Sequence, residues 1–160
     1  MVTDTDMDLI ITELVRMLRE ALGGRFSTYE EGKRDLVGVS ELPLLCVYPR
    51  NTSQRRSGTG NDSAAYDIAI SAVVSVTGAD NQPRIARVAT QMDLVRAFEG
   101  RAPDGSALPN TVFGVLGGDL TVGGSALYTD DFQIAYDPPE DGDVTSRATM
   151  TLKAYTRPLR

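Results

Sequence analysis

The sequence predicts an α+β fold, in which one antiparallel β-sheet with a long arm-bearing hairpin packs against two α-helices. The stretch YDIAISAVVSV, residues 66–76, alternates strictly, as a long half-buried strand does. Apolar residues also recur at helical spacing in two segments, 5–22 and 83–99. A length of 160 residues fits a single domain that spans residues 1–160.

Residues 5–22 form the first expected helix. Thr5 can cap its N-terminus, with Asp8 three residues further on, and Gly23 and Gly24 follow as a stop signal. The apolar stripe consists of Met7, Ile10, Ile11, Leu14, Leu18, Ala21 and Leu22. A helix with one such stripe is expected to lie on a sheet.

The segment LPLLCVYP, residues 42–49, predicts a strand that Pro43 and Pro49 bound, since proline favours strand ends and edges. Both faces of this strand are apolar, which predicts a central or covered position with Cys46 in the core. A polar arm at about residues 50–62 then leads to the long alternating strand. Because the arm has no apolar anchor, we expect it to be mobile in the isolated protomer, either as a solvated hairpin loop or as a segment that orders against a partner.

The small, polar face of the long strand carries Asp67, Ala69, Ser71 and Ser75. We expect this face to be wet or to meet another subunit. The opposite, apolar face is expected to lie under both helices.

The second helix is expected at 83–99, with Pro83 at its first position and Gly100 at its end. Its predicted apolar stripe is Ile85, Val88, Met92 and Val95, broadened by Ala89 and Phe98. Residues 25–42 predict a solvated segment with a short strand at 36–39.

The remaining sequence predicts a loop at 101–118 and a short strand at 119–122. Two longer strands, 128–136 and 144–156, complete the sheet. An acidic connection, 137–143, joins them.

Composition argues against an enzyme. The chain has no histidine and one cysteine, which removes the usual general base, the commonest metal ligand and any internal disulfide. It contains no P-loop, no GxGxxG and no GxSxG pattern. Asp130 and Asp131 resemble a carboxylate pair for glycosidic chemistry, but strand-end acids in solvent are the favoured interpretation. We therefore predict no catalytic residue, no metal site and no cofactor.

The net charge is −6, which argues against general nucleic-acid binding. The apolar runs are too short to cross a membrane, and the first residues are acidic where a signal peptide would be basic. We expect a soluble protein made in a cytosol.

The arrangement of the whole chain resembles the tail terminator and tail-completion proteins of long-tailed bacteriophages. The resemblance rests on the order of DMDLIITELVRMLREALGG, LPLLCVYPR, the arm, YDIAISAVVSV, PRIARVATQMDLVRAFEG and the closing strand RATMTLKAYTRP. It covers nearly all of the chain.

The resemblance implies a structural virion protein of the tail or neck, assembled in the host cytoplasm. It implies a homo-oligomeric ring, commonly a hexamer, that caps the tail tube. One ring face would meet the tail-tube protein and the other the head–tail connector or stopper proteins. DNA would pass through the channel without specific binding, and no membrane would be involved.

Charge suggests where such subunits touch. The arm is basic and the connection at 137–143 is acidic, so the two are expected to pair between neighbouring subunits. The candidate contact residues are Arg50, Arg55, Arg56, Asp67, Asp137, Glu140, Asp141 and Asp143.

Two other classes stay open. The second interpretation is another phage neck, tail-tube or minor capsid subunit, because small α+β folds recur among such proteins. A small-molecule or peptide-binding module is the third interpretation, and a stable monomer with a deep pocket would favour it.

Overall fold

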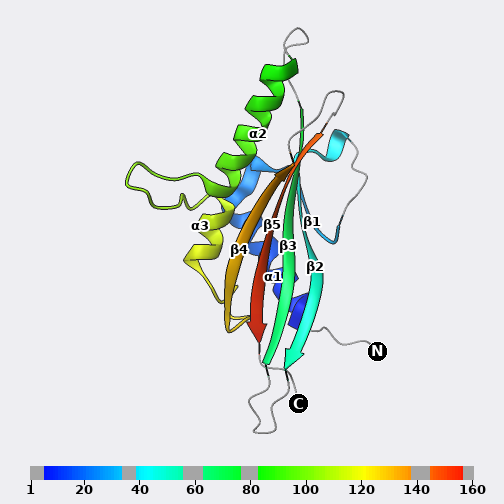
Figure 1. Ribbon diagram of the computed structural model, residues 1–160, viewed down its shortest axis with the longest axis vertical. Coiled ribbons are helices and arrows are strands. Elements are labelled where there is room, and N and C mark those ends of the chain that lie inside the picture. Colours follow the sequence, from blue (N-terminus) through cyan, green and yellow to red (C-terminus); the bar gives the residue numbers. More distant parts are fainter. Residues whose placement is uncertain (1–5, 34–38, 56–62, 77–82, 138–144, 157–160) are drawn as a thin grey trace.

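The computed structural model describes residues 6–33, 39–55, 63–76, 83–137 and 145–156. A five-stranded sheet carries its helices on one face, which confirms the predicted α+β class (Figure 1). The helices are α1 (Asp6–Leu22), α2 (Pro83–Glu99) and α3 (Val112–Gly118), and the strands are β1 (Thr28–Glu31), β2 (Leu44–Arg55), β3 (Ser63–Ser75), β4 (Tyr128–Asp137) and β5 (Thr145–Thr156). Short 3₁₀ turns lie at Gly23–Arg25 and Val39–Glu41.

The sheet is mixed, so the prediction of a purely antiparallel sheet is wrong at one edge. The strand order is β1-β2-β3-β5-β4, and β1 pairs with β2 in parallel, from Thr28 opposite Leu44 to Glu31 opposite Val47. The other three pairings are antiparallel. The connection between β1 and β2 returns the chain to the end where β1 starts, as a parallel pairing requires.

Three local predictions also differ from the structure. The segment expected as a loop at 101–118 ends in α3, and the strand expected at 119–122 is a turn. Pro49 lies inside β2, where a bulge between Pro49 and Asn51 accommodates the residue that cannot donate to the ladder. Of the short strand expected at 36–39, residues 36–38 lie outside the described residues, and Val39 begins a 3₁₀ turn.

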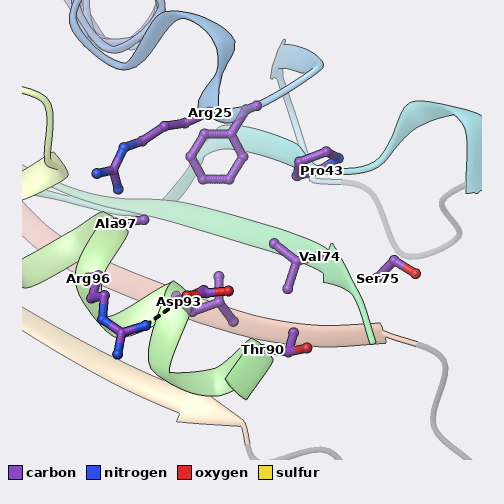
Figure 2. A pocket seen from close by; sticks show the side chains of 10 residues that line it. Arg25, Pro43, Val74, Ser75, Thr90, Asp93, Arg96 and Ala97 are labelled. Atoms are coloured by element: carbon purple, nitrogen blue, oxygen red, sulfur yellow. Dashed lines mark hydrogen bonds and ion pairs between the residues drawn. The ribbon is translucent and has the colours of Figure 1, made fainter. Parts of the chain in front are cut away.

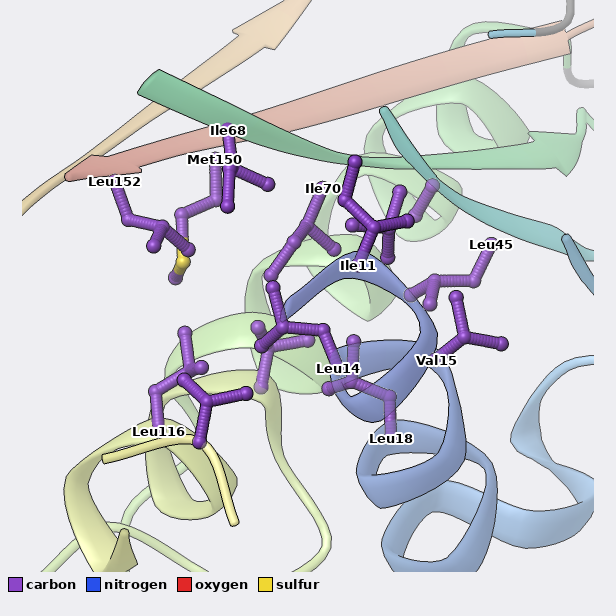
Figure 3. Close-up of a cluster of buried hydrophobic side chains, with 14 of the residues drawn as sticks. Ile11, Leu14, Val15, Leu18, Leu45, Ile68, Ile70, Leu116, Met150 and Leu152 are labelled. Carbon is purple, nitrogen blue, oxygen red and sulfur yellow. The ribbon is translucent and has the colours of Figure 1, made fainter. Parts of the chain in front are cut away.

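The main core fills the space between the helices and the inner face of the sheet (Figure 3). Ile10, Leu14 and Leu18 of α1 are fully buried against Ile68 and Ile70 of β3 within this cluster. The inner residues of β5, from Ala148 to Ala154, are buried as their alternation predicted. The apolar face of the long strand therefore lies under the helices, as expected.

The predicted stripe of α2 is confirmed at Phe98 and wrong at Met92, while the side chains of Ile85, Val88 and Ala89 lie outside the described part of the chain. Leu94, Ala97 and Phe98 are buried, whereas Met92 is 43% exposed. The small side chains of Ala97 and Thr90 let the helix approach the sheet, and the bulkier Met92 lies on its far side.

The outer face of the sheet is not uniformly wet, which corrects the expectation for the polar face of β3. Ala69 and Ser71 are fully buried there. The Ser71 hydroxyl accepts a hydrogen bond of 3.0 Å from the Arg147 guanidinium, and it lies 3.3 Å from the Thr149 hydroxyl. Neighbouring outer-face side chains thus cover a small polar residue without a second layer of helices.

A second apolar cluster lies on the outer face at the start of β2. It consists of Leu44, Cys46 and Val73, all buried, with Leu42 and Tyr48 packed against it. β2 is therefore buried on both faces from Leu44 to Val47, and Cys46 is a buried cysteine, as its sequence context predicted.

Candidate interaction surfaces

The first part of the predicted basic arm, residues 50–55, belongs to β2. β2 continues to Arg55 because its last residues pair with β3, with Asn51 opposite Asp67 and Arg55 opposite Ser63. Arg50 and Arg55 thus lie in β2, with Arg50 at the bulge between Pro49 and Asn51, and the expected mobility of the arm stays a prediction. Arg56 and the rest of the arm lie outside the described residues.

Strand pairing brings Arg50 and Asp67 to one small depression of about 100 Å³, which Asp131 and Lys153 also line. Asp67 stands opposite Lys153 in the β3–β5 register. The Lys153 ammonium lies 3.8 Å from the Asp131 carboxylate. Positive and negative groups therefore alternate across the sheet, and each exposed pair contributes little to stability on its own.

Asp137 lies at the other end of the sheet. It closes β4 opposite Arg147, near the start of β5. Arg55 lies on the far side of β3, level with the end of β5, where Thr156 pairs with Ala64. The structure does not bring Asp137 and the hairpin arginines together within one chain. Glu140, Asp141 and Asp143 lie outside the described residues.

β4 forms an edge of the sheet, and no strand among the described residues pairs with its outer side. A bulge between Asp130 and Gln133 interrupts the ladder, and Asp131 has a φ of 55°. Bulges and charges of this kind protect an edge from indiscriminate pairing. The regular stretch from Gln133 to Asp137 is the part that remains available to another strand.

A groove of about 400 Å³ opens on the helix side of the sheet, between α2 and the segment that follows α1 (Figure 2). Phe26, Val74 and Leu94 contribute apolar lining, and Arg25 and Arg96 stand at its rim. Arg96 donates a hydrogen bond of 2.8 Å to Asp93. Arg25 is exposed and has no partner among the described residues.

The sequence analysis missed this groove. Its lining comes from four separate segments, because Phe26, Pro43, Val74 and Leu94 belong to different elements or connections. These four residues come together only because β2 pairs with β3 and α2 packs on the sheet.

A loop at 119–128 presents apolar side chains at the opposite end of the sheet. The Asp119 carboxylate accepts hydrogen bonds from the Thr121 hydroxyl and the Gly123 amide, and these bonds lower the pKa of Asp119. Val122 is fully buried with a φ of 50°, a strained conformation for a β-branched residue. The loop is therefore held rigidly.

Several large apolar side chains are exposed around the 119–128 loop. Leu120, Leu127 and Tyr128 are 46–53% exposed, and Leu9 on α1 is 50% exposed. These are four of the five large hydrophobic residues exposed in the described part of the chain. Tyr128 stacks on Tyr155, with ring centroids 4.5 Å apart. Hydrogen bonds tie this end together, since Thr156 of β5 donates to Asp6 of α1.

Within the described residues, no three or more histidine, cysteine, aspartate or glutamate side chains gather as a metal site would need. None of the helices in that part of the chain is long and apolar enough to span a membrane.

No family model and no curated protein compared with the chain matches it. Its function must therefore be argued from the fold and from these surfaces.

Proposed function

We propose that this chain is a structural virion protein, a tail terminator of a long-tailed bacteriophage that forms a hexameric ring. The ring would cap the tail tube and join it to the head–tail connector. The proposal combines the resemblance of the whole chain to such proteins with the surfaces of the fold.

One observation carries the proposal: opposite charges lie at opposite ends of the same sheet. Arg55 lies level with the end of β5, with β3 between them, and Asp137 lies beside the start of β5. The nine residues of β5 between these levels separate them by roughly 30 Å at about 3.3 Å per residue. Such groups cannot pair within one protomer but can pair between neighbours.

Contacts between two different surfaces are heterologous, and they close into a ring when the rotation between neighbours permits. The open edge of β4 offers a further contact by strand addition. A net charge of −6 suits a subunit around a DNA channel, because a strongly basic lumen would retain phosphates.

The mass of the native oligomer tests the proposal. Wild-type protein is expected as a hexamer in native mass spectrometry. Reversing both Arg55 and Arg56 to Glu is expected to weaken the ring and increase the smaller species, because like charges would then face the acidic segment. The control is Arg101→Glu, a single charge reversal on the loop after α2, which is compared with Arg55→Glu alone as well as with the double variant.

An unchanged hexamer in the double variant would remove the arm from the interface. A wild-type protein that stays monomeric at all concentrations would contradict the ring itself. In that case the 400 Å³ groove would favour the second candidate, a small binding module. Gene neighbours between capsid and tail-tube genes would separate a tail terminator from other neck, tube or minor capsid subunits.

A further inference from the structure

We infer that the rigid 119–128 loop of one protomer docks into the groove between α2 and the segment after α1 of the next protomer. This inference rests on the proposed ring and names the contact that builds it. The occupant of the groove is thus a second copy of this chain.

The two surfaces lie at opposite ends of the helix-covered side. Val74 and Ser75, at the end of β3, line the groove, and Ser75 pairs with Thr145 at the start of β5. The loop leads into Tyr128, which pairs with Tyr155 near the end of β5. Because the surfaces differ and lie at opposite ends of the sheet, their contact is head-to-tail (Figure 1).

Their shapes correspond. The loop projects Leu120 and Leu127, each about half exposed, while Val122 anchors it in the core. The groove is hollow, and its lining combines apolar side chains such as Phe26, Val74 and Leu94 with polar ones. Its volume of about 400 Å³ falls in the range of about 300–1,000 Å³ typical of pockets that enclose a ligand.

Their charges correspond as well. Arg25, at the rim of the groove, is exposed and lacks a partner among the described residues. Asp119 begins the loop, and Asp130 and Asp131 follow it as exposed residues. The rim thus carries one arginine without a partner beside the Arg96–Asp93 pair, and this positive charge favours an apolar segment flanked by carboxylates, which is the chemistry of this loop.

The loop is also prepared for binding. The Ala126 amide donates to the Thr121 carbonyl at 3.0 Å, and the Thr129 hydroxyl donates to the Leu120 carbonyl at 3.0 Å. A segment already held in one conformation loses little entropy on docking. The strained φ of Val122 is the kind of feature that persists where function maintains it.

Two variants, each with one damaged surface, test the contact. Leu120→Asp damages the loop and leaves the groove intact, and Arg25→Glu does the reverse. Each alone is expected to weaken self-association at least about tenfold, as truncation of an interface anchor commonly does. Mixed in equal amounts, the two variants are expected to form a one-to-one heterodimer. The intact groove of the Leu120→Asp protein can bind the intact loop of the Arg25→Glu protein, whereas the other two surfaces are both damaged.

Met92→Asp is the matched control, since Met92 is an exposed apolar residue on the far side of α2. It is expected to assemble like the wild type. Circular dichroism and thermal melting identify any variant that fails to fold, and for such a variant Leu127→Asp replaces Leu120→Asp. All species are followed by native mass spectrometry.

The outcomes separate the two proposals. If the wild type forms rings and both variants still do so, or if the mixture forms no heterodimer, the loop–groove contact is wrong while the ring remains. If the wild type is monomeric at all concentrations, the ring proposal fails. Heterodimer formation only in the mixture supports the contact.

Discussion

Glycine at position 114 is required by the close approach of α3 to the chain before it. A Cβ atom placed there would lie within van der Waals overlap of the Leu108 carbonyl oxygen, at 1.9 Å. The Gly114 amide also donates to the Thr111 hydroxyl, which caps the helix. A backbone atom cannot move aside as a flexible side chain can, so this contact tolerates no larger residue.

We predict that Gly114→Ala lowers the free energy of unfolding by about 2–4 kcal/mol, because the clash is with backbone. Gly117 provides the control within the same helix, since a Cβ there meets nothing within 4 Å. Gly117→Ala is expected to be neutral or to stabilise by up to about 1 kcal/mol, as alanine favours helix. Urea unfolding of both variants measures the difference, and equal effects would contradict the close-approach argument.

A hydrogen bond connects the edge strand β4 to α2. The Tyr136 hydroxyl on β4 donates to the Glu99 carboxylate at the end of α2, and the Tyr136 ring meets Phe98 edge-on at 6.4 Å. Burial first, and then this hydrogen bond, raise the pKa of Tyr136 above its ordinary value. The hydrogen bond therefore stabilises the packing of α2 against β4 only while the Tyr136 phenol keeps its proton.

The sign of the pH effect follows from that shift. Since the folded protein holds the phenol proton more tightly than the unfolded chain, the stabilisation is complete below about pH 10, the usual pKa of tyrosine, and declines as the pH rises above it. Tyr136→Phe is expected to be less stable than the wild type by about 1 kcal/mol at neutral pH. The difference should shrink towards pH 11.

Urea unfolding of both proteins at several pH values measures this difference. The pKa values of Tyr29 and Tyr155 are also raised, but both residues are present in each protein and largely cancel in the comparison. A stability difference that stayed constant with pH would show that the Tyr136–Glu99 bond is not the cause.

Periodicity predicted the long elements well and the short ones poorly. α1, α2, β3 and β5 each span enough residues for a helical or alternating pattern to appear. β1 has four residues, including Glu30 and Glu31, and is a strand only because β2 pairs with it. α3 contains three glycines in seven residues, so its own propensity opposes a helix that packing of Val112 and Leu116 maintains.

For the molecule as a whole, charge placement predicts a salt-dependent assembly. Arg25 and the hairpin arginines would face carboxylates across the proposed contacts. Raising the salt concentration from about 0.05 M to about 0.5 M shortens the screening length and should weaken self-association of the wild type severalfold.

Sedimentation at several salt concentrations measures this dependence. Arg25→Glu, which removes one of the proposed charge pairs, should show a smaller salt dependence than the wild type. An association that strengthens with salt would indicate that apolar burial alone holds the subunits together.

The candidate surfaces were predictable only in part. Asp67 and Arg50 were recognisable as charged residues beside the long strands, but their meeting with Lys153 depends on the β3–β5 register. The exposure of Leu120 depends on the turn around Val122, where a valine adopts a φ of 50°. No local pattern indicates such a turn, because valine disfavours that conformation.

The strand order has a consequence for the order in which the protein can fold. β5 lies between β3 and β4 but is synthesised after both. The β2–β3 hairpin can form early, while the other edge of β3 stays open through the synthesis of α2, α3 and β4. During that interval β3 presents an unpaired, largely apolar ladder, which is a template for association with other nascent chains. Pairing of Ala64 with Thr156 then closes the sheet across the widest sequence separation in the β3–β5 ladder. Arrival of β5 is thus the step that both completes the core and ends the period of greatest risk of misassembly.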